Sequence, residues 1–155
     1  MSVILLSLTV ALGLEIFPLP ASLEYFRPEW LALALIYWAM ALPERAGLLL
    51  AWGFGLLLDA ATASLLGEHA LGLILVVGLI LLLHRGIRVL PLPQQAVIVT
   101  LLLGIHELVT YWIRGASGHT PPDPALFFAP VATSLLVWPL VFLTLRRMRR
   151  RAGLH

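Results

Sequence analysis

The chain has 155 residues, of which 61% are hydrophobic and only 12% charged, and its mean hydropathy is +0.99. Soluble domains usually carry about 25% charged residues, so this composition excludes an ordinary soluble domain and indicates a membrane protein. The absence of cysteine also excludes disulfides, thiolate catalysis and cysteine metal sites.

The apolar runs predict an all-α integral membrane protein, a six-helix transmembrane bundle in a single domain. Only the run at 124–145 clearly reaches the roughly 20 residues that a bilayer requires. Three other runs reach spanning length only if they include ionisable residues: Glu15, Asp59, and His106 with Glu107. The predicted spans are 2–17, 25–42, 46–63, 68–84, 94–113 and 125–145.

Prolines mark the first connection, between spans 2–17 and 25–42. Pro18, Pro20 and Pro28 can shorten or tilt either flanking helix, because proline lacks an amide hydrogen and restricts the residue before it.

The arginines predict the orientation, because cytoplasmic loops retain positive charge. With both termini in the cytoplasm, the outer side receives Arg27 and Arg114. The cytoplasmic side receives the other eight: Arg45, Arg85, Arg88, Arg146, Arg147, Arg149, Arg150 and Arg151. A basic tail that adjoins a membrane helix is more typical of topology signals and contact with anionic lipid than of nucleic-acid binding, which is not expected.

Neither a metal site nor an enzyme is expected from local motifs. The segment "HELVT" at 106–110 fails the zinc-protease pattern HExxH because position 110 is a threonine. The histidines are scattered over His69, His84, His106, His119 and His155. No serine lies in a nucleophile-elbow sequence. For an intramembrane hydrolase, the only pair of acids to test would be Asp59 with Glu107.

A polar stripe runs along the predicted fifth span. Thr100, Gly104, Glu107, Tyr111 and Arg114 recur at spacings of four, three, four and three, which places them on one helix face. A carboxylate at membrane depth is costly unless it is paired or faces the bundle interior, so Glu107 needs a partner. The long side chain of Arg114 can reach inward from the outer end.

The six-span topology places a set of ionisable side chains toward the outer side: Glu15, Arg27, Asp59, His69, Glu107 and Arg114. Our hypothesis is that they form an ionic network in an outward-facing cavity or interhelical seam, which fixes helix packing and receives a partner. Alternatively, Glu15 and Asp59 are interfacial residues hydrated at their helix ends. His69 follows Gly67 at a helix start, where a histidine is more typical of a cap or packing residue than of a switch.

Glycines and aromatic residues have two interpretations each. Gly47, Gly53 and Gly55 allow close helix contact, with internal packing favoured over a ligand groove. The aromatic residues predict either interfacial belts or packing positions: Trp30, Tyr37, Trp38, Trp112 and Trp138.

Three segments together resemble one protein family: "FRPEWLALALIYWAMALPER" (26–45), "GFGLLLDAATASLLGEHAL" (53–71) and "LPLPQQAVIVTLLLGIHELVTYWI" (90–113). In order and spacing they are similar to the rod shape-determining membrane protein family MreD, and the resemblance covers nearly the whole chain. Its most specific parts are Arg27-Pro28 followed by Tyr37-Trp38, the glycine-rich run ending in Asp59, the stretch from Gly67 through His69 to Leu71, and the turn from Pro91 to Gln95 before a helix that ends at Trp112.

The resemblance implies a non-enzymatic subunit of the bacterial elongation machinery, without a cofactor, in the inner membrane. Members of the family act with MreC, and through it with MreB, with RodA and with its penicillin-binding transpeptidase, in peptidoglycan synthesis. The implied fold is similar to that of S components of energy-coupling-factor transporters, with a pocket that opens outward. The resemblance makes these residues candidate contacts with MreC: Arg27, Pro28, Tyr37, Trp38, Asp59, His69 and Glu107.

A small-molecule-binding S-type subunit of a transporter is the alternative function. It would require an occluded pocket and a cytoplasmic coupling surface, for which small-residue motifs on the first helix would help. That helix offers only Ala11 and Gly13.

Overall fold

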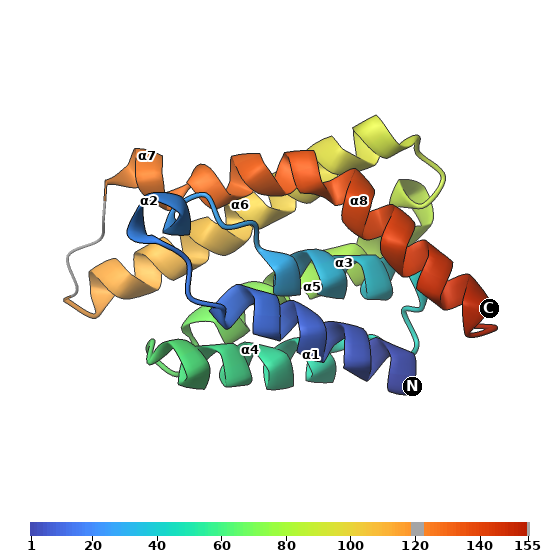
Figure 1. The fold of residues 1–155 in the computed structure, drawn as a ribbon, viewed down its shortest axis with the longest axis horizontal. Coiled ribbons are helices and arrows are strands. Elements are labelled where there is room, and N and C mark those ends of the chain that lie inside the picture. Colours follow the sequence, from blue (N-terminus) through green and yellow to red (C-terminus); the bar gives the residue numbers. More distant parts are fainter. Residues whose placement is uncertain (119–122, 155) are drawn as a thin grey trace.

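The computed structural model describes residues 1–118 and 123–154, and every regular element within them is a helix. Figure 1 shows the helices packed into an elongated bundle. In chain order they are α1 (Ser2–Ile16), α2 (Ala21–Glu24), α3 (Trp30–Ala41), α4 (Leu48–Thr62), α5 (Glu68–Ile87), α6 (Leu92–Ala116), α7 (Pro124–Phe127) and α8 (Ala129–Arg151).

Helix length and composition indicate a membrane protein. Among the described residues, three segments are long and apolar enough to cross a bilayer: α5, α6 and the stretch Pro124–Arg151 that contains α7 and α8. Helices α1, α3 and α4 are apolar but shorter. That all six cross the membrane as one bundle therefore stays a prediction.

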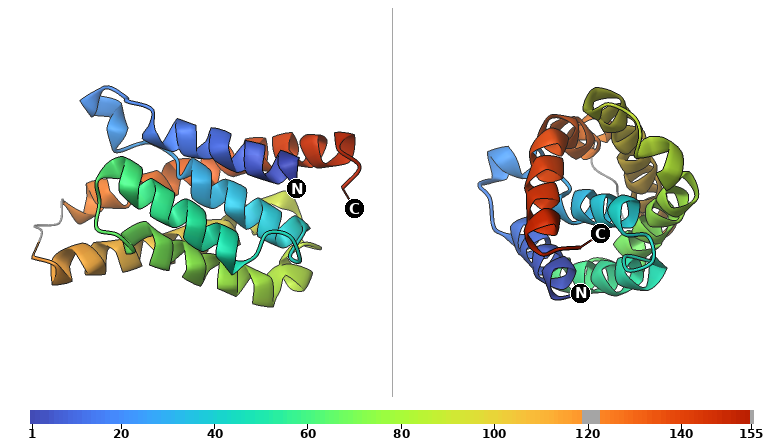
Figure 2. Two further views of the ribbon diagram at one scale, coloured as in Figure 1. Left: turned by 90° about the horizontal axis from the view of Figure 1, so that it is seen from below. Right: turned by 90° about the vertical axis from the view of Figure 1, so that its right-hand side faces the viewer.

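Helix α3 lies at the centre of the bundle. In the end-on view of Figure 2 it lies inside a ring formed by the other long helices, and it contacts α1, α5, α6 and α8. Every residue from Leu31 to Ala41 is buried. A helix of 12 residues is only about 18 Å long. Because protein surrounds α3, the non-helical backbone at its ends does not have to face lipid.

The region of the expected span 25–42 is interrupted. Helix α2 ends at Glu24, and α3 begins only at Trp30, two residues after Pro28. Proline disfavours a helical conformation at the preceding residue, here Arg27, so a continuous helix through this point is unfavourable. Arg27 and Glu29 therefore lie in the connection that leads from α2 to the central helix α3.

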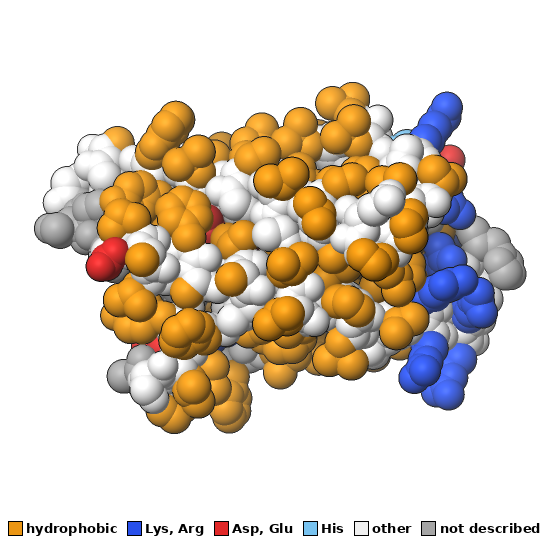
Figure 3. Space-filling view, turned by 90° about the horizontal axis from the view of Figure 1, so that it is seen from above, with side chains coloured by type: hydrophobic (Ala, Val, Ile, Leu, Met, Phe, Trp, Pro, Cys, Tyr) orange, Lys and Arg blue, Asp and Glu red, His pale blue; other side chains and the backbone are white. Residues whose placement is uncertain are grey.

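The charged residues separate toward the two ends of the bundle. Figure 3 shows a surface dominated by hydrophobic side chains, with arginines gathered at one end and acidic groups toward the other. The described N- and C-terminal residues lie together at the arginine-rich end (Figure 1). Arg27 lies in the connection between α2 and α3, and Arg114 lies in the last turn of α6. The orientation in the membrane stays a prediction.

Most of the aromatic residues singled out above serve packing. Tyr37, Trp38 and Trp138 are fully buried. Tyr37 makes edge contacts with Trp38 and Phe142, with ring centroids 5.3 and 5.5 Å apart. Trp112, in contrast, is exposed on the outside of α6, where an interfacial position is available to it.

The contact between α4 and α5 depends on one glycine. A Cβ atom built on Gly55 would overlap the backbone of Ala70, whereas a Cβ on Gly53 would meet no neighbouring atom within 4 Å. The two helices therefore approach each other closely at Gly55, as small residues allow in membrane proteins.

Substitution of Gly55 should test this contact. We expect Gly55→Val to destabilise the protein by about 1–3 kcal/mol, because overpacking forces the helices apart. Gly53→Val, two residues along the same helix, is the matched control. Melting of both variants in detergent measures the difference, and equal melting temperatures would contradict the close approach.

Candidate functional site

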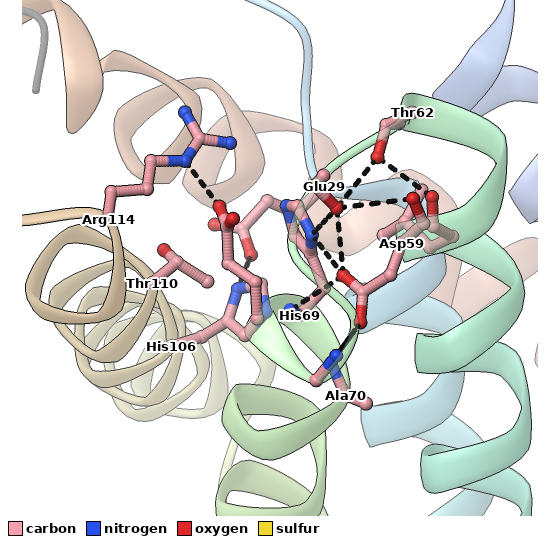
Figure 4. A network of polar contacts seen from close by, with 12 residues as sticks. Glu29, Asp59, Thr62, His69, Ala70, His106, Thr110 and Arg114 are labelled. Carbon is pink, nitrogen blue, oxygen red and sulfur yellow. Dashed lines mark hydrogen bonds and ion pairs between the residues drawn. The ribbon is translucent and has the colours of Figure 1, made fainter. Parts of the chain in front are cut away.

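A network of polar side chains joins several helices, and Figure 4 shows it from close by. Its members come from the ends of α1, α4 and α5, from the second half of α6 and from the connection before α3. We call it the polar cluster and define it by Glu15, Arg27, Glu29, Asp59, Glu68, His69, His106, Glu107 and Arg114.

Asp59 connects the end of α4 to the start of α5. Its carboxylate is fully buried and accepts hydrogen bonds from the main-chain N–H groups of Gly67 (2.8 Å) and His69 (2.9 Å). The hydroxyl of Ser64 donates to it as well, at 3.0 Å. These N–H groups lie at the N-terminus of α5, where they have no partner within the helix. Asp59 thus caps α5 from a neighbouring helix.

The connection from α4 to α5 is shaped to bring these groups to Asp59. Ala63 ends α4 in the left-handed conformation (φ 52°), and Gly67 precedes α5 with φ 100°. Glycine adopts such a conformation readily. The imidazole Nδ1 of His69 then lies 2.8 Å from Oδ1 of Asp59. His69 is therefore held by a carboxylate at the helix start where the sequence places a cap or packing residue.

Arg114 pairs with Glu68, a partner that the sequence did not predict for it. The guanidinium Nε of Arg114, on α6, donates to Oε1 of Glu68, at the start of α5. Glu68 is buried, while Arg114 is half-buried and also lies over the ring of Phe127 at 5.5 Å. The two residues are 46 positions apart, so no helical spacing could indicate the pair.

Glu107 has a different environment from the one expected. Its carboxylate accepts a hydrogen bond from Thr110 at 3.3 Å, and no arginine pairs with it among the described residues. The stripe that contains Glu107 is half-buried along its whole length. The buried face of α6 is offset from it and contains His106 and Thr110.

Glu15 and Arg27 connect α1 to α3 by capping helix ends. Arg27 donates to the main-chain carbonyls of Glu15 and, at 2.7 Å, of Phe17. These carbonyls lie at the C-terminal end of α1 and lack partners within the helix. Oε2 of Glu15 accepts from the main-chain N–H of Leu31 at 3.2 Å, at the start of α3.

Glu29 is the main residue that sequence reasoning missed. Its Oε2 lies 2.7 Å from Nδ1 of His106, and its main-chain N–H donates to Ser134 at 3.0 Å. It thereby joins the start of α3 to α6 and α8. The only local signal is an acidic residue directly after Pro28 and before an apolar helix. Gly72 makes room for the imidazole, since a Cβ there would overlap the ring of His106.

Three of the expected contact residues lie outside the polar cluster. Tyr37 and Trp38 are buried in the core, and the indole Nε1 of Trp38 donates to Ser7 at 2.8 Å. Pro28 is half-buried and precedes Glu29. Of the histidines, His84 lies near the arginine-rich end of α5, while His119 and His155 lie outside the described residues.

Two cavities adjoin the polar cluster. The inner cavity measures about 40 Å³, and its polar lining consists of Glu15, Glu29, His69, His106 and Glu107. A wider cavity of about 180 Å³ shares His69 and Glu107 with it and is bordered by Arg114 and Tyr25. The two shared residues place the wider cavity beside the inner one.

The fold and the polar cluster define a helical membrane protein whose helix ends are joined by buried ionisable side chains. The sequence model of a family described as "rod shape-determining protein MreD" matches residues 1–148. A curated relative with that description, from Haemophilus influenzae, is 34% identical over 148 residues, covering 94% of this chain and 90% of the relative. The chain therefore belongs to the MreD family of rod shape-determining proteins. No solved structure matches it significantly.

Removal of the Asp59 carboxylate should destabilise the protein. We expect Asp59→Ala to lower the free energy of unfolding by about 3 kcal/mol, because hydrogen bonds to a charged group contribute about 1.5–3 kcal/mol each and buried donors lose their acceptor. Glu44→Ala, at an exposed acidic residue, is the control. Thermal melting in detergent measures the effect, and similar melting temperatures for the two variants would contradict the capping role.

A double-mutant cycle should identify the partner of Arg114. The cycle of Glu68→Gln with Arg114→Met should give a coupling energy of about 0.5–3 kcal/mol, as contacting pairs do. The same cycle with Glu107→Gln should give a smaller coupling, because Glu107 is not paired with Arg114. A larger coupling for Glu107 would favour the arrangement expected from the sequence.

Proposed function

We propose that the chain is a non-enzymatic membrane scaffold of the bacterial elongation machinery, which binds MreC and supports peptidoglycan synthesis and rod cell shape. The observation that carries this proposal is the match of residues 1–148 to a family of rod shape-determining proteins. Through MreC the scaffold reaches MreB, RodA and its penicillin-binding transpeptidase.

The hydrogen bonds of the polar cluster support a scaffolding role. Asp59 and Glu15 accept from main-chain N–H groups at helix starts, and Arg27 donates to carbonyls at a helix end. Each of these groups connects two elements of the bundle. Such interactions fix helix positions, which is what a platform for another protein requires.

The candidate contact residues divide by burial. Tyr37, Trp38 and Asp59 are buried, so they support the interface through packing and do not touch a partner. The half-buried residues are the candidates for direct contact with the outer juxtamembrane segment of MreC: Arg27, Pro28, His69, Glu107 and Arg114.

A lateral groove between α1 and α8 is the second candidate surface. It measures about 390 Å³ and is bordered by the exposed side chains of Leu6, Val10 and Leu140, with Ser7 and Ala11 at its base. Small residues let a second helix approach closely in lipid. We therefore place the single membrane helix of MreC in this groove.

The proposal includes six transmembrane helices in an S-component-like bundle in the inner membrane, with both termini in the cytoplasm. The gathering of arginines at one end supports this orientation. The transporter alternative receives less support, because the two cavities at the polar cluster measure about 40 and 180 Å³. Pockets for small-molecule ligands usually measure about 300–1,000 Å³.

Co-purification tests the proposal. The full-length chain, extracted gently from bacterial membranes that also produce MreC, should recover MreC without a stoichiometric metabolite. We expect Val10→Trp to reduce the recovery at least tenfold, because the large ring fills the groove. The matched control is Leu82→Trp, at an exposed position on α5.

The outcomes separate the function from the proposed surface. Failure of the folded wild-type chain to recover MreC would overturn the scaffold function. Equal recovery by the wild type and the Val10→Trp variant would exclude the groove as the binding surface. The half-buried residues of the polar cluster would then be the interface.

A further inference from the structure

The inner cavity brings together residues with the chemistry of a metal site. One ligand atom from each of Glu29, His106 and Glu107 lies within 4.8 Å of the other two. Ligand atoms around a single tetrahedral zinc ion lie about 3.4 Å apart, given bond lengths of about 2.0–2.1 Å. Small side-chain rotations would therefore bring all three onto one ion.

Two side chains that line the inner cavity have buried polar atoms without a partner among the described residues. Glu29 and His106 are 5% and 3% exposed. Over residues 1–118 and 123–154, neither Oε1 of Glu29 nor Nε2 of His106 finds a hydrogen-bond partner. Buried polar groups normally have a partner, so atoms of this kind call for an explanation such as a bound ion.

The balance of charge leads to the same conclusion. Three carboxylates line the inner cavity, those of Glu15, Glu29 and Glu107. The two arginines at this end are engaged elsewhere, Arg27 with main-chain carbonyls and Arg114 with Glu68. Among the described residues, the lining adds two imidazoles but no lysine or arginine. Buried carboxylates are costly unless they are paired, and a divalent cation would supply further positive charge.

The cavity has room for an ion and lies beside a wider cavity. A volume of about 40 Å³ holds one ion with a water molecule, since a single water requires about 10–15 Å³ on the same kind of measure. His69 and Glu107 also line the wider neighbouring cavity.

We propose that Glu29, His106 and Glu107 bind one divalent transition-metal ion, for which Zn²⁺ is the representative. One imidazole nitrogen and two carboxylate oxygens suit this class of ion better than the oxygen-only sites that Mg²⁺ prefers. The ion joins the start of α3 to α6. This site does not depend on the binding of MreC.

Metal loading of the full-length chain tests the site. The protein is purified in detergent through a tag without histidine, stripped with EDTA and incubated with ZnCl₂ or, separately, MgCl₂. After desalting, elemental analysis should find about one zinc per chain and no stoichiometric magnesium. Failure to retain zinc would overturn the proposal.

Variants locate the ion. Glu107→Gln and His106→Gln should weaken zinc binding at least about 100-fold, because loss of even an outer partner of a ligand costs about 10–100-fold. His84→Gln is the matched control and should bind as the wild type does, since His84 lies on α5 with its Nδ1 near the carbonyl of Leu81. Equal zinc binding by Glu107→Gln and the wild type would overturn the assignment.

A measurement on the wild type protects the test against variants that fail to fold. X-ray absorption of the zinc-loaded chain should show a single imidazole and oxygen ligands at about 2.0–2.2 Å. A zinc ion surrounded by several imidazoles would place the metal on other histidines and would overturn the site.

Discussion

The bundle depends on satisfying helix ends without bulk water, and Asp59 is the clearest example. Its buried carboxylate accepts from the first N–H groups of α5, although it belongs to α4. In a membrane every backbone polar group must find a partner within the protein. A charged side chain that would be expensive in lipid is stabilised here because it completes the hydrogen bonding of its neighbour.

The same principle explains how a helix as short as α3 can occupy the centre. Glu15 accepts from the main-chain N–H of Leu31, Glu29 is held by Ser134 and His106, and Arg27 binds the carbonyls at the end of α1. Pro28 prevents a continuous helix before α3. The side chains named above form hydrogen bonds at the helix ends on either side of this break. The first role of the ionisable residues at this end is therefore structural, because they satisfy backbone groups at helix ends.

Structural and binding roles can coincide in one cluster. Within the polar cluster, Asp59 accepts hydrogen bonds from main-chain N–H groups, and Glu68 pairs with Arg114. Glu29, His106 and Glu107 lie around a small cavity whose described lining contains no lysine or arginine. A metal ion in this cavity would act on the same helix ends that form the proposed platform for MreC.

The sequence by itself determined the class of protein, because composition and hydrophobic runs are local properties. It also singled out Asp59, His69 and Arg114 as candidates, whose roles stay predictions. The family also followed from ordered motifs. Only the tertiary structure decided the partners: Glu68 for Arg114, His69 for Asp59 and His106 for Glu29. These pairs join residues 10 to 77 positions apart, and helical periodicity constrains only neighbours three or four positions apart. Which side chains meet was decided by how the helices pack, with α3 at the centre and Gly55 and Gly72 allowing close contact.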